Sequence, residues 1–166
     1  MKNNNKKIPA KKPGKKENKK DLQSKPSTRK QAQKGTKKTR SVPVGRTVMV
    51  RNGHINEGAK KPNEKRTHVV IETNKEDLAL VRLTSKKPNT TQLKHYQDGS
   101  SYFKHFVEIE DVKGNPLRVG EDITQNHQNM DLDHSDVNFI KKTISDSKQK
   151  QKYEKNISKF RNRYKK

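Results

Sequence analysis

The chain has 166 residues, of which 41 are Lys or Arg and 18 are Asp or Glu, so its formal net charge at pH 7 is +23. Only 25% of the residues are hydrophobic, so a single core cannot extend over the whole length and part of the chain is expected to be disordered. The absence of Cys excludes disulfides, thiolate nucleophiles and thiolate zinc sites. The excess of positive charge predicts a polyanionic partner, and we expect a nucleic acid, with RNA favoured.

The N-terminal 40 residues form a distinct basic segment with 16 Lys or Arg and two acidic residues. Its only large apolar residues are Met1, Ile8 and Leu22, which predicts a disordered arm that concentrates the protein on phosphates. The alternative is a solubilising tail or an artefact of expression. No apolar segment follows the basic start and no run of 18 apolar residues occurs, so we expect a cytoplasmic protein without membrane contact.

The first half of the remaining chain predicts three strands. Residues 47–50 are apolar and β-prone, and an Asn-Gly pair at 52–53 predicts the turn that ends this strand. Residues 55–65 contain Gly58 and Pro62 without apolar periodicity, which predicts a mobile loop. The β-branched residues of 68–72 and the apolar run of 78–84 predict a central hairpin.

The second half predicts further strands followed by helices. After the long polar stretch 85–101, residues 102–109 alternate in part and predict a strand, with a turn around 114–116 and a short strand at 117–119. Ser135 and Asp136 are typical of the N-cap of an amphipathic helix that includes Val137 and Ile144. A second, basic helix is expected over 148–163.

This order of elements predicts a mainly β protein with a C-terminal helix, in the α+β class, built on a small bent antiparallel sheet or half-open SH3-type barrel. We expect three regions: the disordered arm at 1–40, the β domain at 41–146, and a basic helix or tail at 147–166.

Residues 44–146 resemble the MazF/PemK toxins of bacterial toxin–antitoxin systems. The segments RTHVVIETN (66–74) and LVRLTS (80–85) are similar to the second and third strands of that family. HFVEI (105–109) and DVNFI (136–140) are similar to a later strand and to the final segment. The sequence departs from the family pattern at Thr67, where Pro is usual, at 45–47, and at 141–143.

The resemblance implies a PemK-like fold and an endoribonuclease that cleaves single-stranded RNA without a metal or cofactor. It also implies a homodimer and an antitoxin that covers the active groove. By the same resemblance Arg66 is the catalytic arginine, because a permanently charged planar guanidinium suits phosphate oxygens. Thr84 is expected to hold the scissile phosphate through its hydroxyl.

Other candidate residues come from residue type and position. His54 and His68 are the best-placed general bases, although a solvated surface role is the alternative for each. No His pair has metal-ligand spacing, so no metal site is expected. The expected nucleic-acid contacts are basic or aromatic residues near the predicted strand ends: Arg46, Arg51, Lys65, Arg82, Lys86, Lys87, Tyr102 and Lys104.

Aromatic and cationic residues also alternate between positions 94 and 106, a pattern that suits stacking of unpaired bases beside phosphate contacts. One of Phe103 and Phe106 is expected in the core instead, because strand alternation must bury one face.

Two other functions stay open. The chain could be a non-enzymatic RNA- or DNA-binding protein of a phage or mobile element that has the same fold, or a ribosomal-type protein with a basic arm. The sequence contains no Gly-rich phosphate loop, Ser nucleophile elbow or paired catalytic carboxylates, so NTPase, esterase and glycosidase functions are disfavoured.

Overall fold

The computed structural model describes residues 41–86, 89–93, 102–126 and 131–165. The expected arm at 1–40, Lys87, and the aromatic and basic residues at 94–96 lie outside these ranges. Along the chain the elements are β1 (Thr47–Arg51), α1 (Asn52–Ile55), β2 (Lys65–Asn74), β3 (Asp77–Thr84), β4 (Thr90–Gln92), β5 (Tyr102–Glu108), β6 (Ile123–Gln125), α2 (His134–Ser145) and α3 (Lys150–Asn162).

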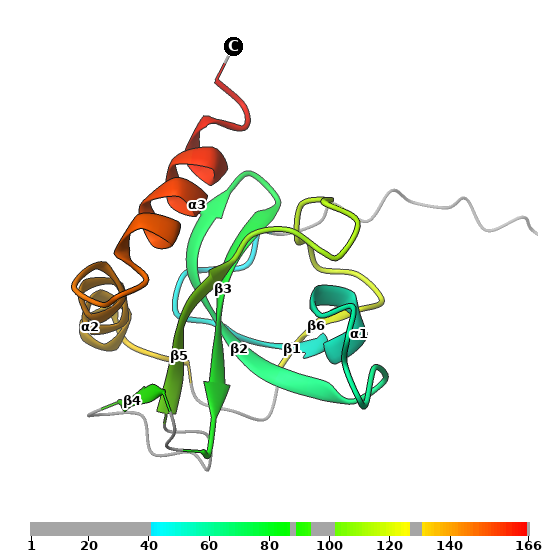
Figure 1. Ribbon diagram of the computed structural model, residues 1–166. Helices are drawn as coiled ribbons and strands as arrows, with labels where there is room; N and C mark the ends of the chain where they lie inside the picture. The colour runs from blue at the N-terminus through cyan, green and yellow to red at the C-terminus, as the bar shows by residue number, and fades with distance from the viewer. Residues whose placement is uncertain (1–40, 87–88, 94–101, 127–130, 166) are drawn as a thin grey trace, which may run out of the picture. The chain divides into compact units, whose positions relative to one another are not determined.

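The six strands form one antiparallel sheet in the order β4-β5-β3-β2-β1-β6 (Figure 1). The sheet is open, since β4 and β6 are its edges. Its register shifts twice, between Val70 and Glu72 on β2 and between Val81 and Leu83 on β3. Such bulges increase strand twist and bending. The expected α+β class with an antiparallel sheet and C-terminal helices is confirmed.

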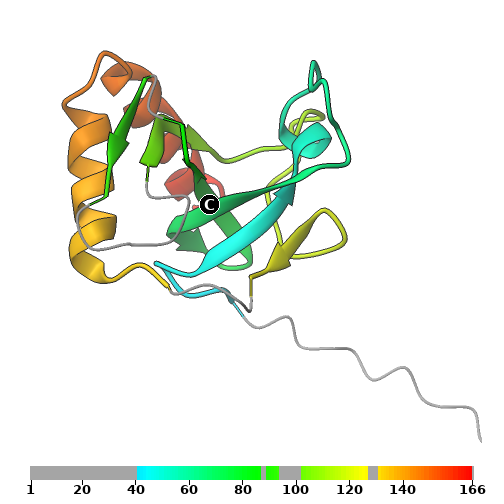
Figure 2. The same cartoon turned by 90° about the horizontal axis from the view of Figure 1, so that it is seen from below.

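Both faces of the central strands are buried, in two apolar clusters. On one face the sheet packs against α2 and α3, which lie together on one side of the sheet in Figures 1 and 2. On the other face a smaller cluster is covered by Val42 and by Leu117 and Ile123 from the segment after β5. Because β2 and β3 are buried on two sides, they are near-continuous apolar runs in the sequence.

Both C-terminal helices have one apolar face, which was expected for α2, whereas α3 was expected only as a basic helix or tail. Val137, Ile140 and Ile144 place one face of α2 against the sheet. Ile157 and Phe160 do the same for α3, so α3 completes the main core rather than following the domain as a tail. Within the described ranges, no helix combines the length and apolar character needed to cross a bilayer.

The structure corrects several local predictions. The N-cap of α2 is Asp133, whose carboxylate accepts the N–H of Asp136 at 2.8 Å, while Ser135 lies inside the helix. The Asn52-Gly53 pair begins the short helix α1 instead of a turn.

Residues 117–119 form no strand. Leu117 is buried and its C=O accepts the N–H of Leu78 at 2.8 Å. The edge strands β4 and β6 were not predicted, because three mostly polar residues are too few to show alternation of apolar and polar side chains. They are strands because they pair with β5 and β1, respectively.

Candidate nucleic-acid interface

A polar pocket of about 220 Å³ opens between the start of β2 and the end of β3. The two strands pair as far as His68 opposite Arg82, and beyond that point β3 separates from β2 while it stays paired with β5 (Figure 1). Arg66 and Thr84 therefore line the two sides of one opening. The lining residues are Lys65, Arg66, Thr67, Arg82, Leu83, Thr84, Ser85 and Lys86.

Arg66 is half-buried beside an acidic residue. Its Nη2 donates to the Oε2 of Glu64 at 2.6 Å, and the two side chains are exposed to a similar degree. Its Nε is enclosed and has no acceptor among the described residues. Glu64 was not among the site residues expected from the sequence. The only feature of the sequence that indicates it is its position two residues before Arg66, because alternate side chains of an extended chain point to the same side.

The hydroxyl of Thr84 already accepts one hydrogen bond. Its Oγ1 accepts the N–H of Lys86 at 3.1 Å. A hydroxyl that accepts from the backbone can still donate its own proton, here to an oxygen bound in the pocket. Thr84 pairs with Tyr102 on β5, so the hydroxyl is held on a paired strand rather than on a loose loop.

The pocket is electropositive. Lys65, Arg66, Arg82 and Lys86 line it, and no carboxylate-bearing side chain is among the lining residues. The Nζ of Lys65 also donates to the Oγ1 of Thr124 on β6, at 3.4 Å. Four cations around a small opening favour an anion the size of a phosphate, and partial desolvation strengthens that attraction.

The two candidate bases lie outside this pocket. His68 is fully buried: its Nδ1 is 2.9 Å from the C=O oxygen of Arg66, and its Nε2 is 3.0 Å from the Glu108 carboxylate without hydrogen-bond alignment. A general base that touches RNA must be accessible, so the structure places His68 in a structural position. His54 lies on α1, with its Nδ1 3.3 Å from Asp122, in a separate cleft that Arg51 also lines.

The remaining expected contacts are dispersed. Arg46 is ion-paired with Asp131 at 3.3 Å, and Arg51 with Asp122 at 2.9 Å. Lys104 lines a different, larger pocket. Of the two phenylalanines, Phe103 fills the core, as expected for one of them, while Phe106 is half-buried.

Within the part of the chain that the structure describes, no group of three or more His, Asp or Glu side chains is arranged to hold a metal ion. No protein-family model, curated protein or solved structure matches the chain. A functional inference therefore depends on the residues and geometry of the pocket.

Proposed function

We propose that the protein binds single-stranded RNA and cleaves it in the pocket between β2 and β3, in the manner of the MazF/PemK endoribonucleases that its sequence resembles. The observation that carries the proposal is that Arg66 and Thr84, the two residues singled out by the resemblance, line one pocket with three further cations. A PemK-like half-barrel, a homodimer and a cognate antitoxin belong to the same proposal.

The chemistry is an internal transesterification. A base removes the proton of a ribose 2′-hydroxyl, and the oxygen attacks the adjacent phosphorus. The bond to the 5′-oxygen breaks, and that oxygen takes a proton from the protonated base or from water, which leaves a 2′,3′-cyclic phosphate and a 5′-hydroxyl. Arg66 and the neighbouring lysines stabilise the negative charge that develops on the phosphate oxygens. The Thr84 hydroxyl donates to one of those oxygens and fixes the phosphate.

Glu64 is the residue we assign as the base. Its carboxylate is 2.6 Å from the Arg66 guanidinium, so a phosphate on Arg66 brings the adjacent 2′-hydroxyl close to it. Neither histidine considered from the sequence has such a position, since His68 is buried and His54 is in another cleft.

The test compares cleavage by the wild type, Arg66→Ala and Thr84→Ala in EDTA, with a single-stranded RNA and its all-2′-deoxy counterpart. We expect the wild type to cut only the RNA, and Arg66→Ala to lose about 100-fold or more of kcat, as for removal of one oxyanion-stabilising donor. Thr84→Ala should lose less. Binding should weaken by only about 10-fold in either variant, since other cations remain.

Cleavage that requires a metal, or equal cleavage by all three proteins, contradicts the assignment. A non-enzymatic RNA-binding protein is the second candidate, favoured by a lining set of cations and hydroxyls with no histidine. That candidate predicts salt-dependent binding with no product from either oligonucleotide.

A further inference from the structure

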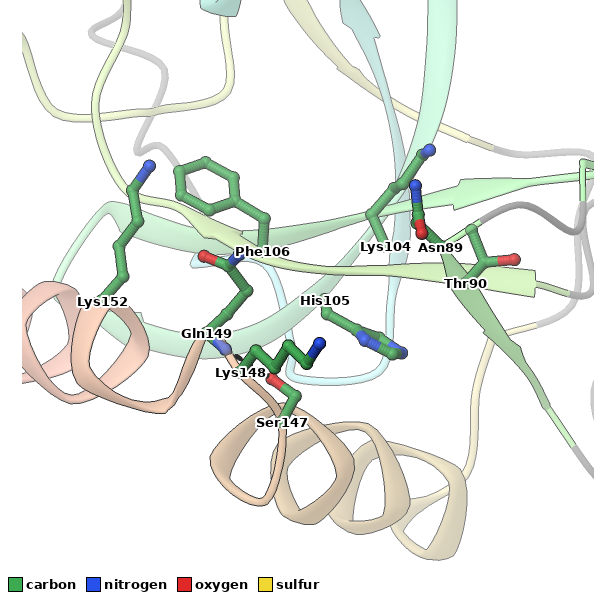
Figure 3. A pocket seen from close by; sticks show the side chains of 9 residues that line it. All are labelled: Asn89, Thr90, Lys104, His105, Phe106, Ser147, Lys148, Gln149 and Lys152. Carbon is green, nitrogen blue, oxygen red and sulfur yellow. Dashed lines mark hydrogen bonds between the residues drawn. The ribbon is translucent and has the colours of Figure 1, made fainter.

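A larger pocket, of about 580 Å³, lies between β5 and the junction of α2 and α3 (Figure 3). Lys104, His105 and Phe106 line it from β5, and Ser147, Lys148, Gln149 and Lys152 from the helical side. Asn89 and Thr90 complete the lining. The proposed cleavage pocket does not include any of these residues.

The charge of this pocket is uncompensated. Lys104, Lys148 and Lys152 line it, and in the described ranges none of the three lies within salt-bridge distance of a carboxylate. Two other cations of α3 are neutralised: Lys159 pairs with Glu110 at 2.6 Å, and Arg161 with Glu72 at 2.6 Å. Three lysines without a described carboxylate partner make this concave surface positively charged, and such a surface attracts an anionic ligand.

The pocket is also lined by the half-buried ring of Phe106, which is not part of the hydrophobic core. Leu83 pairs with Phe103 and Val81 with Val107, so the three residues at 104–106 on β5 stand opposite one residue of β3. A bulge of this kind redirects side chains out of the regular ladder. Phe103 fills the core, whereas Phe106 lines the pocket and has the Nζ of Lys152 4.3 Å from its ring centroid.

We propose that this pocket is a second RNA subsite that holds one unpaired nucleotide, with its base stacked on Phe106 and its phosphate bound by Lys148 and Lys152. An aromatic face beside cations is the usual arrangement for single-stranded RNA, whose bases are free to stack. Lys152 covers the ring in the free protein, and its long, exposed side chain can move to the phosphate when a base takes its place.

This proposal rests on the proposed function, because that function supplies RNA as the ligand. The subsite adds a second place where the protein binds the strand. The hydroxyl of Thr90, in this pocket, donates to the C=O of Lys86, which lines the cleavage pocket, at 3.0 Å. The end of this pocket at Thr90 thus adjoins the end of β3, and in our proposal a single strand held at Phe106 continues past Thr90 toward the cleavage pocket. We expect the subsite to contribute binding of the uncut strand and to leave the chemical step unchanged.

The test measures fluorescence anisotropy of a 2′-O-methyl single strand, which cannot be cleaved, and of its duplex. Phe106→Leu keeps apolar bulk and removes the stacking ring, so single-strand affinity should fall about 5- to 150-fold while duplex affinity stays within about 2-fold. The double variant Lys148→Gln/Lys152→Gln should reduce the slope of log K against log salt by about 1.4, or about 0.7 per lost contact.

The matched control is Lys155→Gln/Lys165→Gln, which removes the same charge from α3 and its C-terminal end without touching this pocket. Unchanged single-strand affinity in Phe106→Leu, or an equal loss of slope in the control, overturns the subsite. RNA cutting separates the two proposals: the subsite variants should raise KM with kcat unchanged. A wild type that binds the strand through Phe106 but never cuts refutes the nuclease alone, and one that does not bind RNA refutes both.

Discussion

The Arg66–Glu64 ion pair gives the candidate site two opposed properties. The carboxylate of Glu64 occupies one side of the guanidinium at 2.6 Å, so it competes with any phosphate for that cation. The same carboxylate is the acceptor nearest to a 2′-hydroxyl in the proposed reaction. Binding and cleavage should therefore respond in opposite directions when this one charge is removed.

We expect Glu64→Gln to bind single-stranded RNA roughly 2- to 5-fold more tightly, the scale of one surface ion pair. Its cleavage rate should fall by about 10²- to 10⁴-fold, because an amide cannot accept the 2′-hydroxyl proton. Anisotropy with a non-cleavable strand measures the first effect, and single-turnover cleavage the second.

Glu57→Gln is the control, since Glu57 is exposed in the same loop and, unlike Glu64, is not the ion-pair partner of Arg66. An unchanged cleavage rate in Glu64→Gln excludes Glu64 as the base. Tighter binding with no wild-type cleavage favours the non-enzymatic RNA-binding protein.

At the scale of elements, the C-terminal end of α3 is fixed to the β2–β3 hairpin by a buried carboxylate. Asp77 is fully buried at the start of β3 and accepts from Arg118 at 2.7 Å and from Arg163 at 2.8 Å. Burial alone would raise the pKa of Asp77, but hydrogen bonds from Arg163, Arg118 and Tyr164 outweigh it and hold the pKa below its ordinary value of 3.8. Arg163 also pairs with Glu110 at 3.0 Å.

We expect the carboxylate of Asp77 to make the free energy of unfolding decrease at acidic pH. Because its pKa is lower in the folded chain than in the unfolded chain, its contribution is complete above the ordinary value and is lost as the pH falls through the folded-state pKa. Asp77→Asn should lower the free energy of unfolding at neutral pH by about 3 kcal/mol, since it leaves two cations without their buried partner.

Urea unfolding at neutral pH and at about pH 3 measures both effects; the variant should lose less stability on acidification than the wild type. Asp146→Asn, at an exposed carboxylate after α2, should stay within about 0.5 kcal/mol of the wild type. An equal acid dependence in Asp77→Asn and the wild type contradicts the role of Asp77.

At the scale of the whole molecule, charge is distributed unevenly along the sequence. Residues 1–40 carry a net charge of +14 of the total of +23. We expect deletion of residues 1–40 to reduce the salt slope of RNA binding by several units, at about 0.7 per lost phosphate contact. The deletion should raise KM for cleavage and leave kcat unchanged, because the pocket between β2 and β3 is intact.

Titrations at several salt concentrations test this expectation, with the full chain as reference. A salt slope unchanged by the deletion shows that the arm does not act as an electrostatic tether, and leaves solubility as its role.

The sequence by itself determined the basic character, the central hairpin, the strand at β5 and the amphipathic helix α2, because apolar periodicity and β-branched runs are local signals. It predicted α3 only as a basic helix or tail, without its apolar face. Arg66 and Thr84 were singled out by the resemblance of two separate segments, 66–74 and 80–85, to strands of the MazF/PemK family. The sequence did not reveal that His68 is buried, because β2 is buried on both faces and alternation then carries no information about exposure.

Only the tertiary structure decided which charges are neutralised and which are not. Arg46 and Arg51 form ion pairs with acidic residues far away in sequence. Lys104, Lys148 and Lys152 line one pocket, and none of them has an acidic partner among the described residues. The edge strands β4 and β6 likewise exist through pairing with distant residues. Local composition cannot encode such contacts, since they depend on where the bends of the sheet and the helix junction bring separate segments together.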